Sequence, residues 1–221
     1  MKDNQHPTVQ RILEAAMDIF SEVGFNGARV DEIAKRAEVN KAMIYYHIGD
    51  KEALYAEVLH NAIGHVADSI SGRIEAASTP EEKLLAYVRG FAGAVEGNPR
   101  MGPILLREIA SGGQNLPELV VKDFARLIGI VTSIIEEGKN KGSFIDVTPF
   151  ILHMMVAGSI VLYKTSGPIR AKKANIPDFI RMLDVNVSER VVNEISNLIL
   201  RGIKKEPDYV LKKETKRGVA G

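Results

Sequence analysis

The stretch DEIAKRAEVNKAMIYYH (residues 31–47) decides the fold of the N-terminal part of the chain. It predicts two short helices, 31–37 and 41–47, joined by the turn EVN. These lengths and this spacing are typical of a helix-turn-helix, whose second helix lies in the major groove of DNA. Asn40 is a favourable N-cap for the second helix. The stretch is therefore either a core segment or a surface that lies on DNA.

The residues before this stretch predict a longer helix. Apolar side chains recur at 3.6-residue spacing over 8–23, and Gly24 follows at a position where helices often end. Two short helices bury too little apolar surface to be stable alone. We therefore expect helix 8–23 to pack against Ile33, Val39 and Ile44 and to complete a three-helix core.

The rest of the chain also predicts helices. Residues 50–77 form one long amphipathic pattern, and Thr79, Pro80 and Glu82 then have the spacing of a capping box. No segment alternates with period two for long enough to be a strand. A loop or short helical turn is expected in 167–186. Five further helices are expected, at 80–96, 99–111, 116–141, 148–165 and 188–205.

The predicted fold class is all-α, with about nine helices. A chain of 221 residues can hold a small domain and a larger one. We expect a helix-turn-helix domain at 1–50, a larger helical domain at 51–205 and a basic polar tail at 206–221.

Composition excludes several classes of site. The chain has no cysteine, and its five histidines include no pair at i and i+4, so we expect no metal and no cofactor. It contains no phosphate loop, nucleophile elbow or paired-carboxylate motif, so we do not expect an enzyme. The N-terminus has no signal-peptide core, and no apolar run approaches the roughly 18 residues of a membrane span. We therefore expect a cytoplasmic protein.

Net charge alone does not favour nucleic-acid binding. The formal net charge is +1, and residues 1–51 hold seven basic and eight acidic residues. Tyrosine and histidine can, however, donate hydrogen bonds to phosphate without adding charge, and a helix N-terminus favours phosphate. Donors placed along helix 41–47 could thus replace bulk positive charge.

Residues 11–59 resemble the N-terminal domain of the tetracycline-repressor (TetR) family of bacterial transcription regulators. The residues that carry the resemblance are Ala15, Ala16, Phe20, Gly24, Phe25, Ile33, Ala34, Ala37, Val39, Ile44, Tyr45, Tyr46, His47, Lys51, Glu52 and Leu54. The resemblance implies a homodimer whose C-terminal helical domain binds a small-molecule effector. It implies a repressor that the effector releases from an inverted-repeat operator in double-stranded DNA. The alternative is a helical small-molecule-binding or interaction protein without DNA binding.

The resemblance also implies DNA contacts by position. Lys41 would read a guanine edge and Ala42 a thymine methyl. Val30 stands where many members have a hydroxyl residue, so Arg29 could take that contact. Glu38 stands where a glycine often opens the turn. The full set of implied contacts is Arg29, Val30, Lys41, Ala42, Met43, Tyr45, Tyr46, His47 and Lys51.

Each of these residues also has an ordinary structural interpretation. Tyr45 and Tyr46 could be core aromatics, but adjacent helix positions cannot both face one core, so at least one is expected to be exposed. Lys41 could be a solvated lysine, and His47 a helix-end cation.

The C-terminal helices supply the expected dimer interface and ligand residues. Helix 148–165 is apolar nearly all round, so it must be buried on most sides. Together with the last helix it would form a four-helix dimer interface, the alternative being a single-chain core. The expected interface residues are Met155, Gly158, Leu162, Val191, Val192, Ile195, Leu198 and Ile199. The expected ligand contacts are Tyr87, Arg89, Arg107, His153 and Met154, although His153 could be a core histidine and Arg107 a salt-bridge partner.

Overall fold

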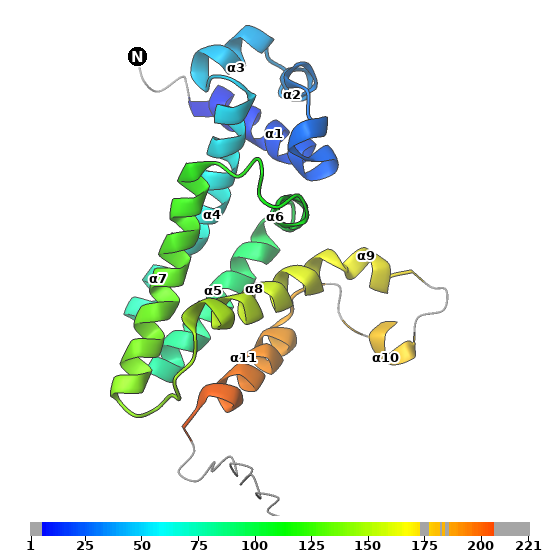
Figure 1. Ribbon diagram of the computed structural model, residues 1–221. Helices are drawn as coiled ribbons and strands as arrows, with labels where there is room; N and C mark the ends of the chain where they lie inside the picture. Colours follow the sequence, from blue (N-terminus) through cyan, green and yellow to red (C-terminus); the bar gives the residue numbers. More distant parts are fainter. Residues whose placement is uncertain (1–5, 173–176, 182, 184–185, 206–221) are drawn as a thin grey trace, which may run out of the picture.

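The computed structural model describes residues 6–172, 177–181, 183 and 186–205, most of which lie in helices (Figure 1). Within these ranges no strand occurs, although an isolated bridge pairs Phe144 with Lys204. The predicted all-α class is therefore confirmed. The predicted tail at 206–221 lies outside the described residues.

Three helices form the N-terminal part: α1 (His6–Gly27), α2 (Val30–Arg36) and α3 (Lys41–His47). Helix α3 has the predicted bounds. Gly24 was predicted to end α1, but the structure has a kink there instead. Its φ of 72° interrupts the helical backbone, and helical structure resumes as far as Gly27.

The three helices share one core. Phe20 of α1, Ile33 of α2 and Ile44 of α3 are fully buried in it. Ile44 is the buried residue of α3, so the core holds this helix through a single side chain and leaves its other faces available.

Helix α4 (Lys51–Glu75) connects the N-terminal helices to the rest of the protein. Gly49, at φ 119°, turns the chain between α3 and α4, and the Asp50 carboxylate caps α4 by accepting from the Ala53 N–H at 2.8 Å. Helix α4 packs on α1 and then on α5 and α7 (Figure 1). It therefore touches both parts of the molecule.

The remaining helices follow the predicted order. The capping box at Thr79 and Glu82 is formed as expected. Two short helices, α9 and α10, lie in the region predicted to be a loop or helical turn. The helices are α5 (Pro80–Gly97), α6 (Met101–Ala110), α7 (Glu118–Asn140), α8 (Pro149–Thr165), α9 (Gly167–Arg170), α10 (Asp178–Arg181) and α11 (Glu189–Ile203).

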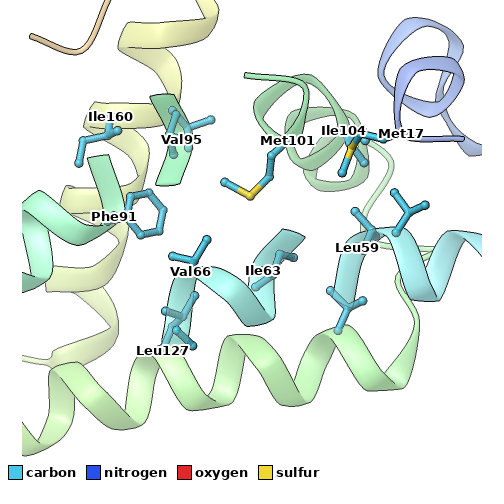
Figure 2. Packing of buried hydrophobic residues seen from close by; sticks show 14 of the residues in the cluster. Met17, Leu59, Ile63, Val66, Phe91, Val95, Met101, Ile104, Leu127 and Ile160 are labelled. Atoms are coloured by element: carbon cyan, nitrogen blue, oxygen red, sulfur yellow. The ribbon is translucent and has the colours of Figure 1, made fainter. Parts of the chain in front are cut away.

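The core of the C-terminal helices is aliphatic and aromatic. Figure 2 shows Ile63 and Val66 of α4, Phe91 of α5 and Met101 of α6 directed into the space between these helices. Helix α6 also packs against α1, so this core continues into the N-terminal part. Helix α6 is thus a second connection between the two parts, beside α4.

Candidate DNA-binding surface and ligand cavity

Helix α3 exposes a row of side chains on the side away from its core contact. Ala42, Met43, Tyr45 and Tyr46 are exposed, with exposed fractions of 50% for Tyr45 and 77% for Tyr46. The expectation that at least one tyrosine would be exposed is confirmed, since both are. Large exposed rings on a short helix are informative, because surface aromatics of this kind are typical of binding faces.

The start of α3 is fixed by its turn. The Asn40 side chain accepts from the Ala42 N–H at 3.0 Å, as an N-cap should. Glu38 precedes it with φ 54°, the left-handed conformation that glycine adopts without cost. The turn therefore has the backbone expected of a position where glycine is common, although this chain places a glutamate there.

Two lysines beside α3 already have intramolecular partners. The Lys41 ammonium lies 3.0 Å from the Asp31 carboxylate, and this hydrogen bond raises the pKa of Lys41. The Lys51 ammonium lies 4.4 Å from the centre of the Phe25 ring. Any contact of either lysine with DNA would have to replace or share these interactions.

Val30 and Arg29 occupy the start of α2. The Val30 side chain is buried in the core, so it cannot make the implied contact with DNA. An apolar side chain at this position is drawn into the core that α2 shares with α1. Arg29, the N-cap residue, is exposed and makes no capping hydrogen bond with its side chain, so it can reach a phosphate in place of Val30.

Two arginines fix α6 to α1. Arg100 reaches Asp18 at 2.7 Å and Glu14 at 2.8 Å. Arg107 donates to the backbone carbonyl of Glu22 at 2.8 Å and also to the backbone carbonyl of Ser21. Helix α6 is therefore attached to α1 near both of its ends.

A cavity of about 480 Å³ lies among α4, α5, α6, α7 and α8. Its wall is almost entirely apolar, which is typical of sites for small organic molecules. Its lining residues are Ile63, Val66, Phe91, Met101, Leu105, Leu106, Glu108, Ile109, Gly113, Leu116, Phe124, Leu127, His153, Met154, Ala157, Gly158, Val161 and Leu162.

Of the five expected ligand residues, His153 and Met154 line this cavity. Tyr87 lies behind the wall, fully buried, with its hydroxyl 2.7 Å from His153 Nδ1. Arg89 and Arg107 do not line this cavity. Arg89 is exposed on α5, and Arg107 is held by the carbonyl groups of α1.

Sequence reasoning missed Glu108, which lies in the wall of the cavity. It is 5% exposed, and its Oε1 accepts from the Tyr55 hydroxyl at 2.8 Å. Burial, followed by this hydrogen bond, raises the pKa of Tyr55, so the phenol stays protonated as the donor. The signal was present in α6, because Glu108 continues the apolar stripe of Met101, Ile104 and Leu105 at i+7.

Residues 12–58 match the family model described as bacterial regulatory proteins of the tetR family. These residues include all of α2 and α3 and the start of α4. Residues 12–58 therefore belong to the tetR family of regulatory domains.

Relatives aligned over most of their length extend the similarity beyond these residues. The transcriptional repressor NicS of Pseudomonas putida is 28% identical over 207 residues, covering 90% of this chain and 93% of NicS. The transcriptional regulator RutR of Escherichia coli is 25% identical over 193 residues, covering 87% and 89% of the two chains. A crystal structure of the regulator FadR from Bacillus subtilis with stearoyl-CoA has a TM-score of 0.69 and 20% identity, covering 87% of this chain and 98% of FadR.

The predicted dimer residues fall into three groups, which are exposed, buried and partly buried. Met155 and Leu162 of α8 and Leu198 of α11 are exposed, with exposed fractions of 56% for Leu162 and 67% for Leu198. Val192 and Ile199 are instead buried within the chain, because α11 turns this side of its apolar stripe toward the chain's own helices. These two residues are therefore removed from the predicted interface.

The other predicted interface residues, Gly158, Val191 and Ile195, are partly buried. Among the described residues, no helix combines the length and the apolar character that crossing a lipid bilayer requires.

Proposed function

We propose that the protein is a homodimeric repressor that binds an inverted-repeat operator through α3 and leaves it when an effector occupies the cavity. The observation that carries the proposal is the exposed face of α3, where Tyr45 and Tyr46 stand free of the core. NicS, a relative aligned over nearly its whole length, is named a transcriptional repressor. We do not expect an enzyme, since the relatives are regulators.

In this proposal α3 enters the major groove. The tyrosine hydroxyls and His47 donate to phosphate, which positions the helix without requiring a basic domain. Lys41 leaves its ion pair with Asp31 and donates to a guanine edge instead. Ala42 contacts a thymine methyl. Met43, Arg29 and Lys51 complete the contact surface.

The proposed dimer forms through α8 and α11. Met155, Leu162 and Leu198 are exposed, and an exposed apolar face of this kind typically marks an interface. Two-fold symmetry of the dimer would place the two copies of α3 on half-sites about one helical turn of DNA apart.

The proposed response to effector passes through α4 and α6. Both helices line the cavity and both pack on α1. A ligand that shifts α6 would carry α1 with it through Arg100 and Arg107. The separation of the two α3 helices would then no longer fit the operator. Such a response requires the effector to favour the DNA-free conformation over the DNA-bound one by only about 1–3 kcal/mol.

The test is selection of bound duplexes from a random DNA pool by the purified protein at two salt concentrations. The proposal predicts enrichment of one inverted repeat, with affinity that falls as salt rises. Failure to enrich any sequence at low salt, after removal of co-purified ligand, would favour the alternative, a helical binding protein without DNA binding.

A further inference from the structure

The chemistry of the cavity wall restricts the charge of its ligand. Among the lining residues, all of which the structure describes, two have ionisable side chains, Glu108 and His153, and none is a lysine or arginine. Arg107 is adjacent in sequence to Glu108, but it is occupied by carbonyl groups of α1. An anionic ligand would therefore find no cation in the wall.

Glu108 has an unused acceptor. Its Oε1 accepts from the Tyr55 hydroxyl at 2.8 Å and from the Asn115 amide at 3.5 Å. Its Oε2 is buried and has no hydrogen-bond partner among the described residues. Leaving a buried carboxylate oxygen unpartnered is costly, and buried polar atoms in folded proteins nearly always have partners. The missing partner is expected to come from the cavity.

His153 does not supply positive charge to the cavity. It is buried, and burial lowers its pKa, so the ring is neutral near pH 7. Its Nδ1 shares a hydrogen bond with the Tyr87 hydroxyl at 2.7 Å, which fixes the ring in the wall. It is therefore a neutral residue of the same cavity wall as Glu108.

We propose that the effector is an apolar molecule carrying a protonated amine, whose N–H donates to Glu108 Oε2 while its apolar part fills the cavity. This inference rests on the proposed function, because it names the ligand class of the same cavity. A charge-assisted hydrogen bond in a water-poor site is stronger than a neutral one, so the amine would determine both affinity and orientation.

The same carboxylate connects the ligand to the N-terminal helices. Tyr55, held by Glu108, packs its ring against Phe20 at 4.7 Å and Phe25 at 5.0 Å between ring centres. An amine that draws the Glu108 carboxylate into the cavity weakens its bond to Tyr55. The effect would reach α1 through these two phenylalanine rings.

The test compares three probes of similar length, 1-octylamine, 1-octanol and octanoate, by calorimetric titration of the full-length protein at pH 7.5. The inference predicts that octylamine binds about tenfold or more tightly than octanol, and that octanoate binds most weakly. Tighter binding of octanoate than of octylamine would overturn it, and so would the absence of measurable binding by octylamine.

Glu108→Gln provides the matched variant. The glutamine carbonyl can still accept from the Tyr55 hydroxyl, so the fold is expected to hold, but the charge is gone. The variant is expected to lose the roughly tenfold preference for octylamine over octanol. Met154→Leu, which changes an apolar wall residue, is expected to keep it. An unchanged preference in Glu108→Gln would refute the role of the carboxylate.

The wild-type comparison needs no variant, so the inference stays testable if Glu108→Gln is unstable. Its failure is also distinguishable from failure of the proposed function. A protein that enriches an inverted repeat but prefers octanoate remains a DNA-binding regulator with a different effector. A protein that prefers octylamine through Glu108 but enriches no DNA keeps the site and loses the regulatory role.

Discussion

Removing one hydroxyl group, by Tyr55→Phe, tests the connection between the cavity and the N-terminal helices. Tyr55 is almost completely buried, and its hydroxyl donates to Glu108 Oε1 at 2.8 Å. Phenylalanine keeps the ring contacts with Phe20 and Phe25. The substitution therefore deletes the hydrogen bond and little else.

The expected cost follows from what Glu108 loses. A hydrogen bond to a charged group contributes about 1.5–3 kcal/mol, and Oε1 would keep only the 3.5 Å contact from Asn115. We expect the free energy of unfolding to fall by about 2 kcal/mol. For a chain of 221 residues this corresponds to a drop in Tm of about 4–8 °C.

The assay is thermal and urea-induced unfolding at one fixed protein concentration, because the stability of the proposed dimer would depend on concentration. Tyr46→Phe is the matched control, because it removes an exposed hydroxyl and is expected to change stability by less than about 0.5 kcal/mol. Equal stabilities of Tyr55→Phe and the wild type would refute the argument that Glu108 depends on this donor.

Three further predictions concern single positions. Glu38→Gly should raise the free energy of unfolding by about 1 kcal/mol, because glycine adopts the left-handed conformation at φ 54° without steric strain. A lower free energy of unfolding, measured with urea, would contradict this. Gly138→Ala should lower the free energy of unfolding by about 2 kcal/mol or more, because its Cβ would lie 2.0 Å from the Phe144 ring. The control is Gly129→Ala in the same helix, whose Cβ would meet no atom within 4 Å; it should leave the free energy of unfolding unchanged or raise it in the same assay. Burial lowers the folded-state pKa of His153 below its ordinary 6.5, so the unfolded chain binds more protons in acid and stability should fall as pH drops below about 6.5. Urea unfolding of His153→Gln should show a smaller fall in the free energy of unfolding between pH 7.5 and pH 5.5 than that of the wild type. An equal fall in the two proteins would assign the pH dependence to other groups.

The N-terminal elements could be predicted because their signals are local. Asn40 caps α3 within two residues, and Ile44 is the apolar side chain that α3 must bury. Exposure of both Tyr45 and Tyr46 then follows from the short helix and its single core contact. Gly24 was misjudged because a glycine at positive φ can kink a helix as well as end it.

The cavity was less predictable because its residues meet only in three dimensions. Arg107 was expected to contact ligand, but it binds backbone carbonyls of α1 more than 80 residues earlier in the chain. Glu108, its neighbour, continues the apolar stripe of α6, which indicates burial, but nothing local indicates that Tyr55 supplies its donor. Periodicity also could not show which apolar residues of α11 face the chain's own core and which face outward. In the structure Ile199 is buried within the chain and Leu198 is exposed.

The most direct test of the central claim is the affinity of wild type and Tyr46→Ala for the selected inverted repeat, with thermal stability measured on the same samples. Loss of one hydrogen bond to phosphate per protomer, at about 1.5 kcal/mol each, predicts about 100-fold weaker binding by the dimer. The exposed position predicts unchanged stability and dimerisation, and Lys35→Ala on α2 serves as a control that should bind within a few-fold of wild type. Undiminished binding by Tyr46→Ala, or a collapse of its stability, would contradict the assignment of α3 as the DNA-binding surface.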